Sequence, residues 1–193
     1  MLEFDSLLDH VIAYRAQFGE APGTWSAKRE LAAAVRELMN SLCATDAPKE
    51  ELLAIAAQVR ESAQRFAKQP RMLNPPGVGE ASLASGMEMF LDRSPMVGLS
   101  NPIAMPLELD PDLEDRVVRG RVVFGNAYEG APGCVHGGFV ASVLDEALGM
   151  ASAFWGGPSM TGQLTTRYRK PTPINTPLRL EARLDRTEGR KVY

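Results

Sequence analysis

Two neighbouring acids, Asp145 and Glu146, are set into the most apolar helical pattern of the sequence. Over 138–154, apolar side chains cover most of the helix circumference, and a helix of this kind is normally buried. A carboxylate in a buried helix costs free energy unless it is paired or takes part in chemistry. Both acids are candidate functional groups. The alternative is a structural acid paired with an arginine of a neighbouring sheet.

The same helix begins at two glycines, Gly137 and Gly138. The first N–H groups of a helix have no partner within it, and the helix dipole adds partial positive charge there. Because glycine has no side chain, the carbonyl of a ligand can come close to these groups. This end of the helix is a candidate oxyanion site. Asp145 lies two turns beyond Gly138 and so falls on roughly the same face.

Strand patterns lie before and after this helix in the sequence, and they indicate that a sheet packs against it. A valine-rich alternating pattern precedes the helix, and several further strand patterns follow it. The order of a strand, a helix and then a run of strands is typical of the α+β class. We predict strands over 117–124, 160–170, 178–185 and 191–193, with a hairpin turn at Glu188-Gly189.

Three amphipathic helices are expected ahead of this unit, because apolar residues recur there at helical spacing. They are predicted at about 4–18, 26–43 and 46–69.

The composition then shifts to Pro, Gly, Ser and Met, and no periodicity persists. We interpret this connecting segment as an ordered wrap over the next domain, and a mobile linker is the alternative. The predicted organisation is a helical segment at 1–69, the connecting segment at 70–111 and the main domain at 112–193. The apolar residues expected to pack are Met87, Met89, Phe90, Leu91, Met96, Val97 and Leu99.

The bulk properties of the 193 residues exclude several classes of function. A net charge of -3 does not suggest a nucleic-acid binder. Two distant cysteines and two distant histidines form no disulfide framework and no metal cluster, so we expect no metal and a reducing compartment. The acidic start does not resemble a targeting peptide, and no apolar stretch is long enough for a membrane span. We therefore expect a cytoplasmic protein.

The ordered combination of motifs over about 94–193 resembles a known family, the hotdog thioesterases of the phenylacetate-pathway (PaaI) type. The likeness is closest to the animal mitochondrial acyl-CoA thioesterases related to the carboxyl-terminal modulator protein. It implies a hotdog fold, in which an antiparallel sheet wraps a long central helix, and acyl-CoA thioesterase activity. In chain order the motifs are His136-Gly137-Gly138, Asp145 within Val-Leu-Asp-Glu-Ala-Leu-Gly, Gly156-Gly157, Met160-Thr161, Tyr168-Arg169-Lys170-Pro171-Thr172-Pro173, Leu184-Asp185 and Glu188-Gly189-Arg190-Lys191.

This resemblance implies roles for the acids and for the start of the helix. The acid matching Asp145 acts either as general base toward water or as nucleophile toward the thioester. Glu146 is the alternative, because some hotdog lineages use a glutamate from this helix. A backbone N–H at Gly137 or Gly138 would hold the thioester oxygen.

The resemblance also brings in Thr161 and His136. Thr161 matches a threonine that positions water or the carboxylate, and in hotdog dimers it can serve the Asp145 of the partner chain. His136 is too far from Asp145 along the helix for a local pair. We interpret His136 as an anchor of the loop, with a substrate contact as the alternative.

Coenzyme A is expected only as part of the acyl-CoA substrate, and no cofactor is expected. Basic side chains on exposed strands suit its phosphates, and the matching region of the family binds coenzyme A. The resemblance further implies a homodimer or a dimer of dimers. The expected substrate-binding residues are Arg167, Arg169, Lys170, Arg190 and Lys191.

The sequence ends at Tyr193, inside the fourth predicted strand, whereas the resemblance implies a hotdog sheet that continues for two more strands after Glu188-Gly189-Arg190-Lys191. We expect the hotdog domain to be incomplete at this end, with part of the helix and one sheet edge uncovered. Two functions other than hydrolysis remain as alternatives. One is a non-catalytic acyl-CoA binding or regulatory module, and the other is a hotdog dehydratase or hydratase.

Overall fold

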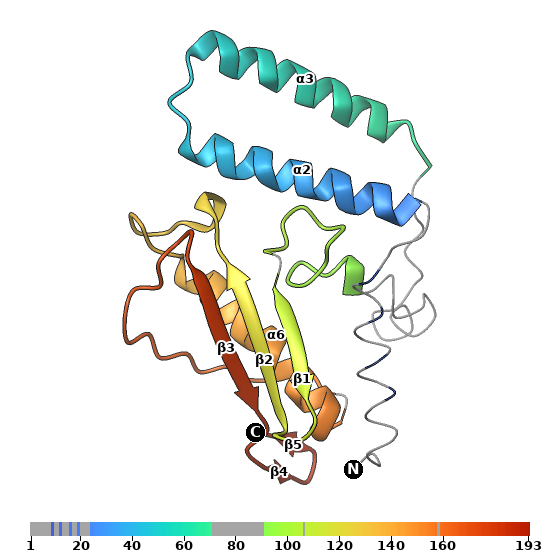
Figure 1. Ribbon diagram of the computed structural model, residues 1–193, viewed down its shortest axis with the longest axis vertical. Coiled ribbons are helices and arrows are strands. Elements are labelled where there is room, and N and C mark those ends of the chain that lie inside the picture. Colours follow the sequence, from blue (N-terminus) through green and yellow to red (C-terminus); the bar gives the residue numbers. More distant parts are fainter. Residues whose placement is uncertain are drawn as a thin grey trace.

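A computed structural model shows a three-stranded antiparallel sheet packed against one long helix, with two further helices across one end of the sheet (Figure 1). This arrangement confirms the predicted α+β class. The structure describes residues 9, 12, 16, 19, 24–70, 91–105, 107–157 and 159–193. Its elements are α2 (Thr24–Ala44), α3 (Lys49–Ala67), β1 (Glu108–Asp112), β2 (Val117–Val123), η1 (Asn126–Tyr128), α6 (Gly137–Trp155), β3 (Pro177–Arg183), β4 (Thr187–Glu188) and β5 (Lys191–Val192).

Strand β2 is the centre of the sheet, with β1 and β3 on either side. Its alternation confirms the prediction, because Val118 and Val122 are buried in the core while Arg121 is exposed on the opposite face. Strand β1 was not predicted, since it contains Pro111. Proline is tolerated there because an edge strand does not need every N–H for the ladder.

Helix α6 packs one side on the sheet and leaves the other open. Val143, Ala147 and Ala151 recur every four residues and are buried, whereas Leu148 is 42% exposed. The helix is therefore not buried on nearly all sides, as its apolar pattern had suggested, and the expectation that part of it is uncovered is confirmed for the described chain. A single sheet layer covers only one side of a helix, so the apolar residues on the other side remain open.

The predicted strand over 160–170 is also wrong within the described chain. The segment forms no strand there, and Met160 is 91% exposed. A strand needs a neighbour to receive its backbone hydrogen bonds, and β3 occupies the place beside β2 instead. The later predictions are confirmed: β3 covers the third strand, and β4 and β5 form the hairpin, with Gly189 at φ 58.

Helix α2 confirms the predicted second helix and is held by polar contacts. Arg36 Nη1 donates to the carbonyl oxygen of Asn101 at 2.8 Å, and the side chain of Asn40 accepts from the N–H of Ala127 at 3.1 Å.

In the connecting segment, Val97 and Met105 are buried in the core, as an ordered wrap requires. Met87, Met89 and Phe90 lie outside the described residues, as does most of the predicted helix at 4–18.

The ion pair between Arg29 and Asp92 ties α2 to the connecting segment. Arg29 Nε lies 2.8 Å from Asp92 Oδ1, and the Asp92 side chain is only 4% exposed. Arg29→Met would leave this carboxylate charged and unpaired, so we expect the free energy of unfolding to fall by about 3 kcal/mol in urea titration. Arg29→Met with Asp92→Leu should recover part of that loss. No recovery would show that the buried charge is not the cause.

No helix in the described ranges combines the length and the apolar character that a membrane span requires.

Candidate functional site

The loop before α6 is fixed by backbone hydrogen bonds on both sides. The N–H of His136 donates to the carbonyl of Tyr128 at 2.9 Å, and the N–H of Val135 donates to the carbonyl of Thr172 at 2.8 Å. Within the loop, the N–H of Gly130 donates to the carbonyl of Cys134 at 2.8 Å. The first turn of α6 is therefore held in a defined position between η1 and the chain that enters β3.

His136 caps α6 and changes which glycine amide is available. The N–H of Gly138 donates to His136 Nδ1 at 3.1 Å, so this nitrogen acts as an unprotonated acceptor. This is the contact that a loop-anchoring histidine would make. Among the described residues the N–H of Gly137 has no hydrogen-bond partner. Of the two predicted oxyanion donors, Gly137 is thus the one left free.

Tyr168 covers Gly137 and was not predicted as a site residue. Its hydroxyl donates to the carbonyl of Gly137 at 2.8 Å. A Cβ on Gly137 would meet the tyrosine ring at 3.2–3.3 Å, so glycine lets the ring approach this closely. The two residues are 31 positions apart. Local spacing carries no signal for such a contact, although Tyr168 belongs to the motif that suggested the family.

Asp145 and Thr161 meet on the side of α6 that the sheet leaves open. Thr161 Oγ1 donates to Asp145 Oδ1 at 2.7 Å. The contact lies within one chain, whereas the resemblance had allowed it to cross to a partner. Oδ2 of Asp145 has no partner within the described part of the chain, and the side chain is partly exposed. One oxygen is thus oriented and the other is open to a ligand or to water.

Gly137 and Asp145 cannot act on the same carbonyl group of one substrate within one chain. They are eight residues apart on α6, which corresponds to about 12 Å along the helix axis. A general base and an oxyanion donor must each lie about 3 Å from the reacting group. Within one chain the two predicted groups are therefore too far apart to act on one carbonyl group.

Glu146 is next to Asp145 but lies in a different environment. Burial raises the pKa of the Glu146 carboxyl, and the neighbouring charge of Asp145 raises it further. Folding therefore makes Glu146 hold its proton more tightly than it does in the unfolded chain.

The raised pKa of Glu146 predicts a stability that depends on pH. The folded state holds the proton more tightly than the unfolded state, so stability falls as pH rises from the ordinary value of 4.5 through the raised pKa. Glu146→Gln cannot ionise and should have a higher Tm than the parent at pH 7. The two should converge at a pH below 4.5. A constant difference across this range in thermal unfolding would contradict the assignment.

The five basic residues expected to bind coenzyme A are all exposed. The structure does not bring them together in one place: three lie on the segment 159–170, Arg190 lies in the turn between β4 and β5, and Lys191 begins β5. None forms an ion pair with another described residue, so their charges remain available to an anion. The five are Arg167, Arg169, Lys170, Arg190 and Lys191.

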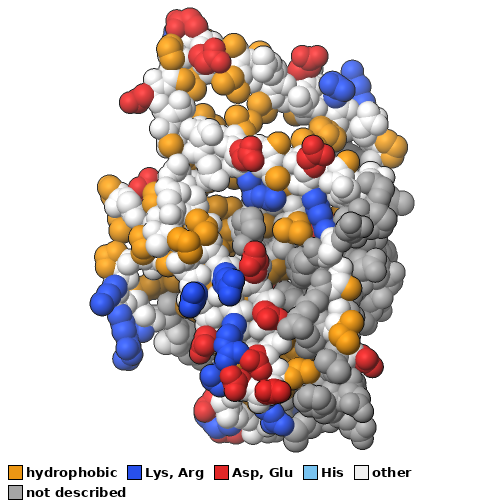
Figure 2. Space-filling model, in the orientation of Figure 1, with side chains coloured by type: hydrophobic (Ala, Val, Ile, Leu, Met, Phe, Trp, Pro, Cys, Tyr) orange, Lys and Arg blue, Asp and Glu red, His pale blue; other side chains and the backbone are white. Residues whose placement is uncertain are grey.

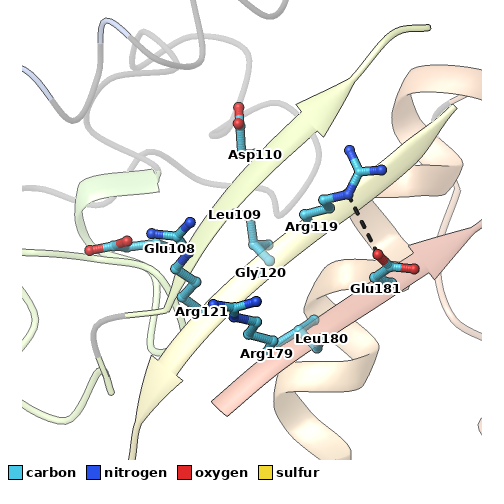
Figure 3. Close-up of a pocket in the computed structure, with 9 residues that line it drawn as sticks. All are labelled: Glu108, Leu109, Asp110, Arg119, Gly120, Arg121, Arg179, Leu180 and Glu181. Atoms are coloured by element: carbon cyan, nitrogen blue, oxygen red, sulfur yellow. Dashed lines mark ion pairs between the residues drawn. The ribbon is translucent and has the colours of Figure 1, made fainter. Parts of the chain in front are cut away.

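A depression of about 490 Å³ lies over the face of the sheet that points away from α6 (Figure 3). Acidic and basic side chains gather over this face (Figure 2). Arg119 Nε lies 3.5 Å from Glu181 Oε1, and Arg121 stands opposite Arg179 in the register of β2 and β3. The depression contains none of the predicted site residues.

The part of the chain that the structure describes contains no cluster of side chains suited to a metal ion.

Comparison with known proteins connects this geometry to one family. A family model described as the thioesterase superfamily matches residues 132–193, which include α6, Thr161 and Tyr168. A solved thioesterase superfamily protein is 31% identical in sequence, with a TM-score of 0.72. The match covers 90% of this chain and 80% of that one, so the structural likeness extends well beyond residues 132–193.

Curated relatives match a shorter stretch. The acyl-coenzyme A thioesterase THEM4 of Xenopus laevis is 35% identical over 69 residues, which is 36% of this chain and 31% of that protein. THEM4 of Rattus norvegicus is 40% identical over 65 residues, or 34% and 28%. The human acyl-coenzyme A thioesterase THEM5 is 30% identical over 69 residues. The chain thus spans less than a third of the length of these relatives.

Proposed function

Because the chain belongs to the thioesterase superfamily and has its hotdog fold, we propose that it hydrolyses acyl-CoA thioesters to a free acid and coenzyme A. The observation that carries the proposal is the carboxylate of Asp145. Thr161 holds one of its oxygens at 2.7 Å, the other oxygen is open, and the sheet leaves this side of α6 uncovered. The names of the curated relatives support acyl-CoA as the substrate class.

The carboxylate can start the reaction in either of two ways. As a base, Asp145 takes a proton from water while the water oxygen bonds to the thioester carbon. As a nucleophile, a carboxylate oxygen bonds to that carbon, and water then releases the acid from the resulting anhydride. In both routes the C–S bond breaks, and the coenzyme A sulfur leaves as a thiolate that takes up a proton.

The oxyanion that forms on the thioester oxygen needs a donor close to it. The free N–H of Gly137 at the positive end of α6 is suited to this role. Since Gly137 and Asp145 lie about 12 Å apart along one helix, the complete site combines Gly137 of one chain with Asp145 of a second. The proposed enzyme is therefore a homodimer with two shared sites. The exposed arginines and lysines would bind the phosphates of coenzyme A.

The test is release of free thiol from acyl-CoAs of short, medium and long chain and from an aryl-CoA, with Asp145→Asn as the control. We expect turnover of at least one substrate by the parent chain and a rate about a thousandfold or more lower for the variant. Tight binding of acyl-CoA without release of thiol would instead show a non-catalytic binding module. Hydration of an enoyl-CoA would show a hydratase.

A further inference from the structure

Helix α3 presents an apolar stripe that nothing in the described chain buries. The stripe runs along Leu52, Ile55, Val59, Ala63 and Phe66, and Ala56 and Leu53, the latter 56% exposed, lie beside it. No residue of α3 is buried. Leu52, Val59 and Phe66 are 38%, 46% and 59% exposed. Most helical stability in proteins comes from tertiary packing of the apolar face rather than from the intrinsic preference of the residues. A packing partner for this stripe is therefore expected.

Helix α2 adds to the same surface because it turns its polar side toward the domain and leaves its apolar side exposed. Its polar side, which carries Arg36 and Asn40, bonds to the domain. Its apolar side is exposed, with Leu31, Leu38 and Leu42 at 44%, 37% and 61%. Helix α3 lies beyond α2, on the side away from the sheet, and hydrophobic side chains line both helices (Figures 1 and 2). Exposed apolar residues gathered on neighbouring helices in this way are typical of an interaction site.

We propose that the partner is a second copy of this chain, and that the two α3 helices pair antiparallel. The stripe residues are spaced by 3, 4, 4 and 3 positions, so the pattern reads the same in both directions from Val59. A two-fold axis at Val59 places Leu52 opposite Phe66 of the second copy and Ile55 opposite its Ala63. Val59 then packs against itself. An interface between identical chains requires this self-complementarity.

The charges beside the stripe support the same orientation. Glu51 directly precedes Leu52 and Arg65 directly precedes Phe66, so both flank the stripe on one side. Within one helix they are 14 positions apart, about 21 Å, which is too far to pair. In the antiparallel arrangement Glu51 of each copy meets Arg65 of the other. Neither forms an ion pair with another described residue.

The charge of α3 also argues against a membrane surface as the partner. The helix contains three acids and three bases, so its polar side has no excess of positive charge. Helices that lie on anionic membranes usually carry Lys and Arg on that side.

Cysteine cross-linking tests the axis. In a chain with Cys43→Ser, which removes the exposed thiol of α2, Val59→Cys should form a covalent dimer on mild oxidation in most of the sample. Ala57→Cys is the matched control, since it lies two positions away on the opposite side of α3 and is exposed. Equal cross-linking of both variants, or none with Val59→Cys, would overturn the proposal.

A charge exchange tests the orientation. Glu51→Arg and Arg65→Glu should each weaken self-association about tenfold in light scattering across a dilution series. Because each single change creates two like-charge pairs and the double variant restores both pairs, the combination should recover the parental association. Failure of the double variant to recover would exclude antiparallel pairing. The pairing of α3 helices would join chains at a surface separate from the site on α6, so the association measured is that between dimers that already share their sites. All three variants should therefore keep the parental rate of thioester hydrolysis, and this outcome is separate from the fate of the proposed function.

Discussion

Asp145→Asn is expected to lower kcat for acyl-CoA hydrolysis by about a thousandfold or more, because asparagine can neither take a proton from water nor attack the thioester. The amide has nearly the same shape as the carboxylate and can still accept the hydrogen bond from Thr161. The fold should therefore persist, with a Tm close to that of the parent. Steady-state thiol release and thermal unfolding, measured on the same preparation, separate loss of chemistry from loss of structure.

Two control variants make this result specific. Glu146→Gln changes the neighbouring acid, whose pKa is raised by burial, and should keep most of the activity. Thr161→Val removes the hydroxyl that orients Asp145 and should cost about tenfold in kcat, roughly the worth of one hydrogen bond to a charged group. Full activity of Asp145→Asn together with an inactive Glu146→Gln would assign the chemistry to Glu146 instead.

Gly137→Pro is expected to lower kcat by about a hundredfold to a thousandfold, the usual cost of removing one oxyanion donor. Proline lacks the N–H but is well tolerated as the first residue of a helix. His136, at φ -61 and ψ 129, already has the extended backbone that a residue before proline adopts. Helix α6 should therefore form with the donor absent.

Gly137→Ala is the matched control for this change. Alanine keeps the N–H, and both variants place a Cβ 3.2–3.3 Å from atoms of Tyr168. Any shift of the tyrosine ring affects both, so the ratio of their kcat values reports the contribution of the amide. Equal losses in the two variants would show that the N–H of Gly137 takes no part in the reaction.

Mixed dimers of the two inactive variants test whether the site is shared. In a dimer of one Asp145→Asn chain and one Gly137→Pro chain, one site carries both changes and the other carries neither. Random pairing makes half of the dimers mixed, so co-expression should restore about a quarter of the parental activity. Activity that stays at the level of the single variants would show that each chain acts alone. It would contradict the shared site that we infer from the separation of about 12 Å along α6.

The local pattern of apolar residues was sufficient to predict most of the helices and strands. The apolar positions of α2, α3 and α6 recur at helical spacing, and β2 alternates between core and surface. Each of these signals lies within one short window, where backbone geometry alone decides which side chains share a face. The start of α6 at Gly137 and the position of Asp145 two turns along it were predictable for the same reason.

The tertiary structure decided which groups in that helix are free and which are engaged. Tyr168 reaches Gly137 across 31 positions, and Thr161 reaches Asp145 across 16. The alternating segment 160–170 forms no strand in the described chain, while β1 forms one despite Pro111. These outcomes depend on which distant segments of the chain pack side by side. A local pattern indicates only the direction in which the side chains of one segment point. The sequence by itself therefore determined the helix and its acid, and the packing of distant segments decided the geometry of the site.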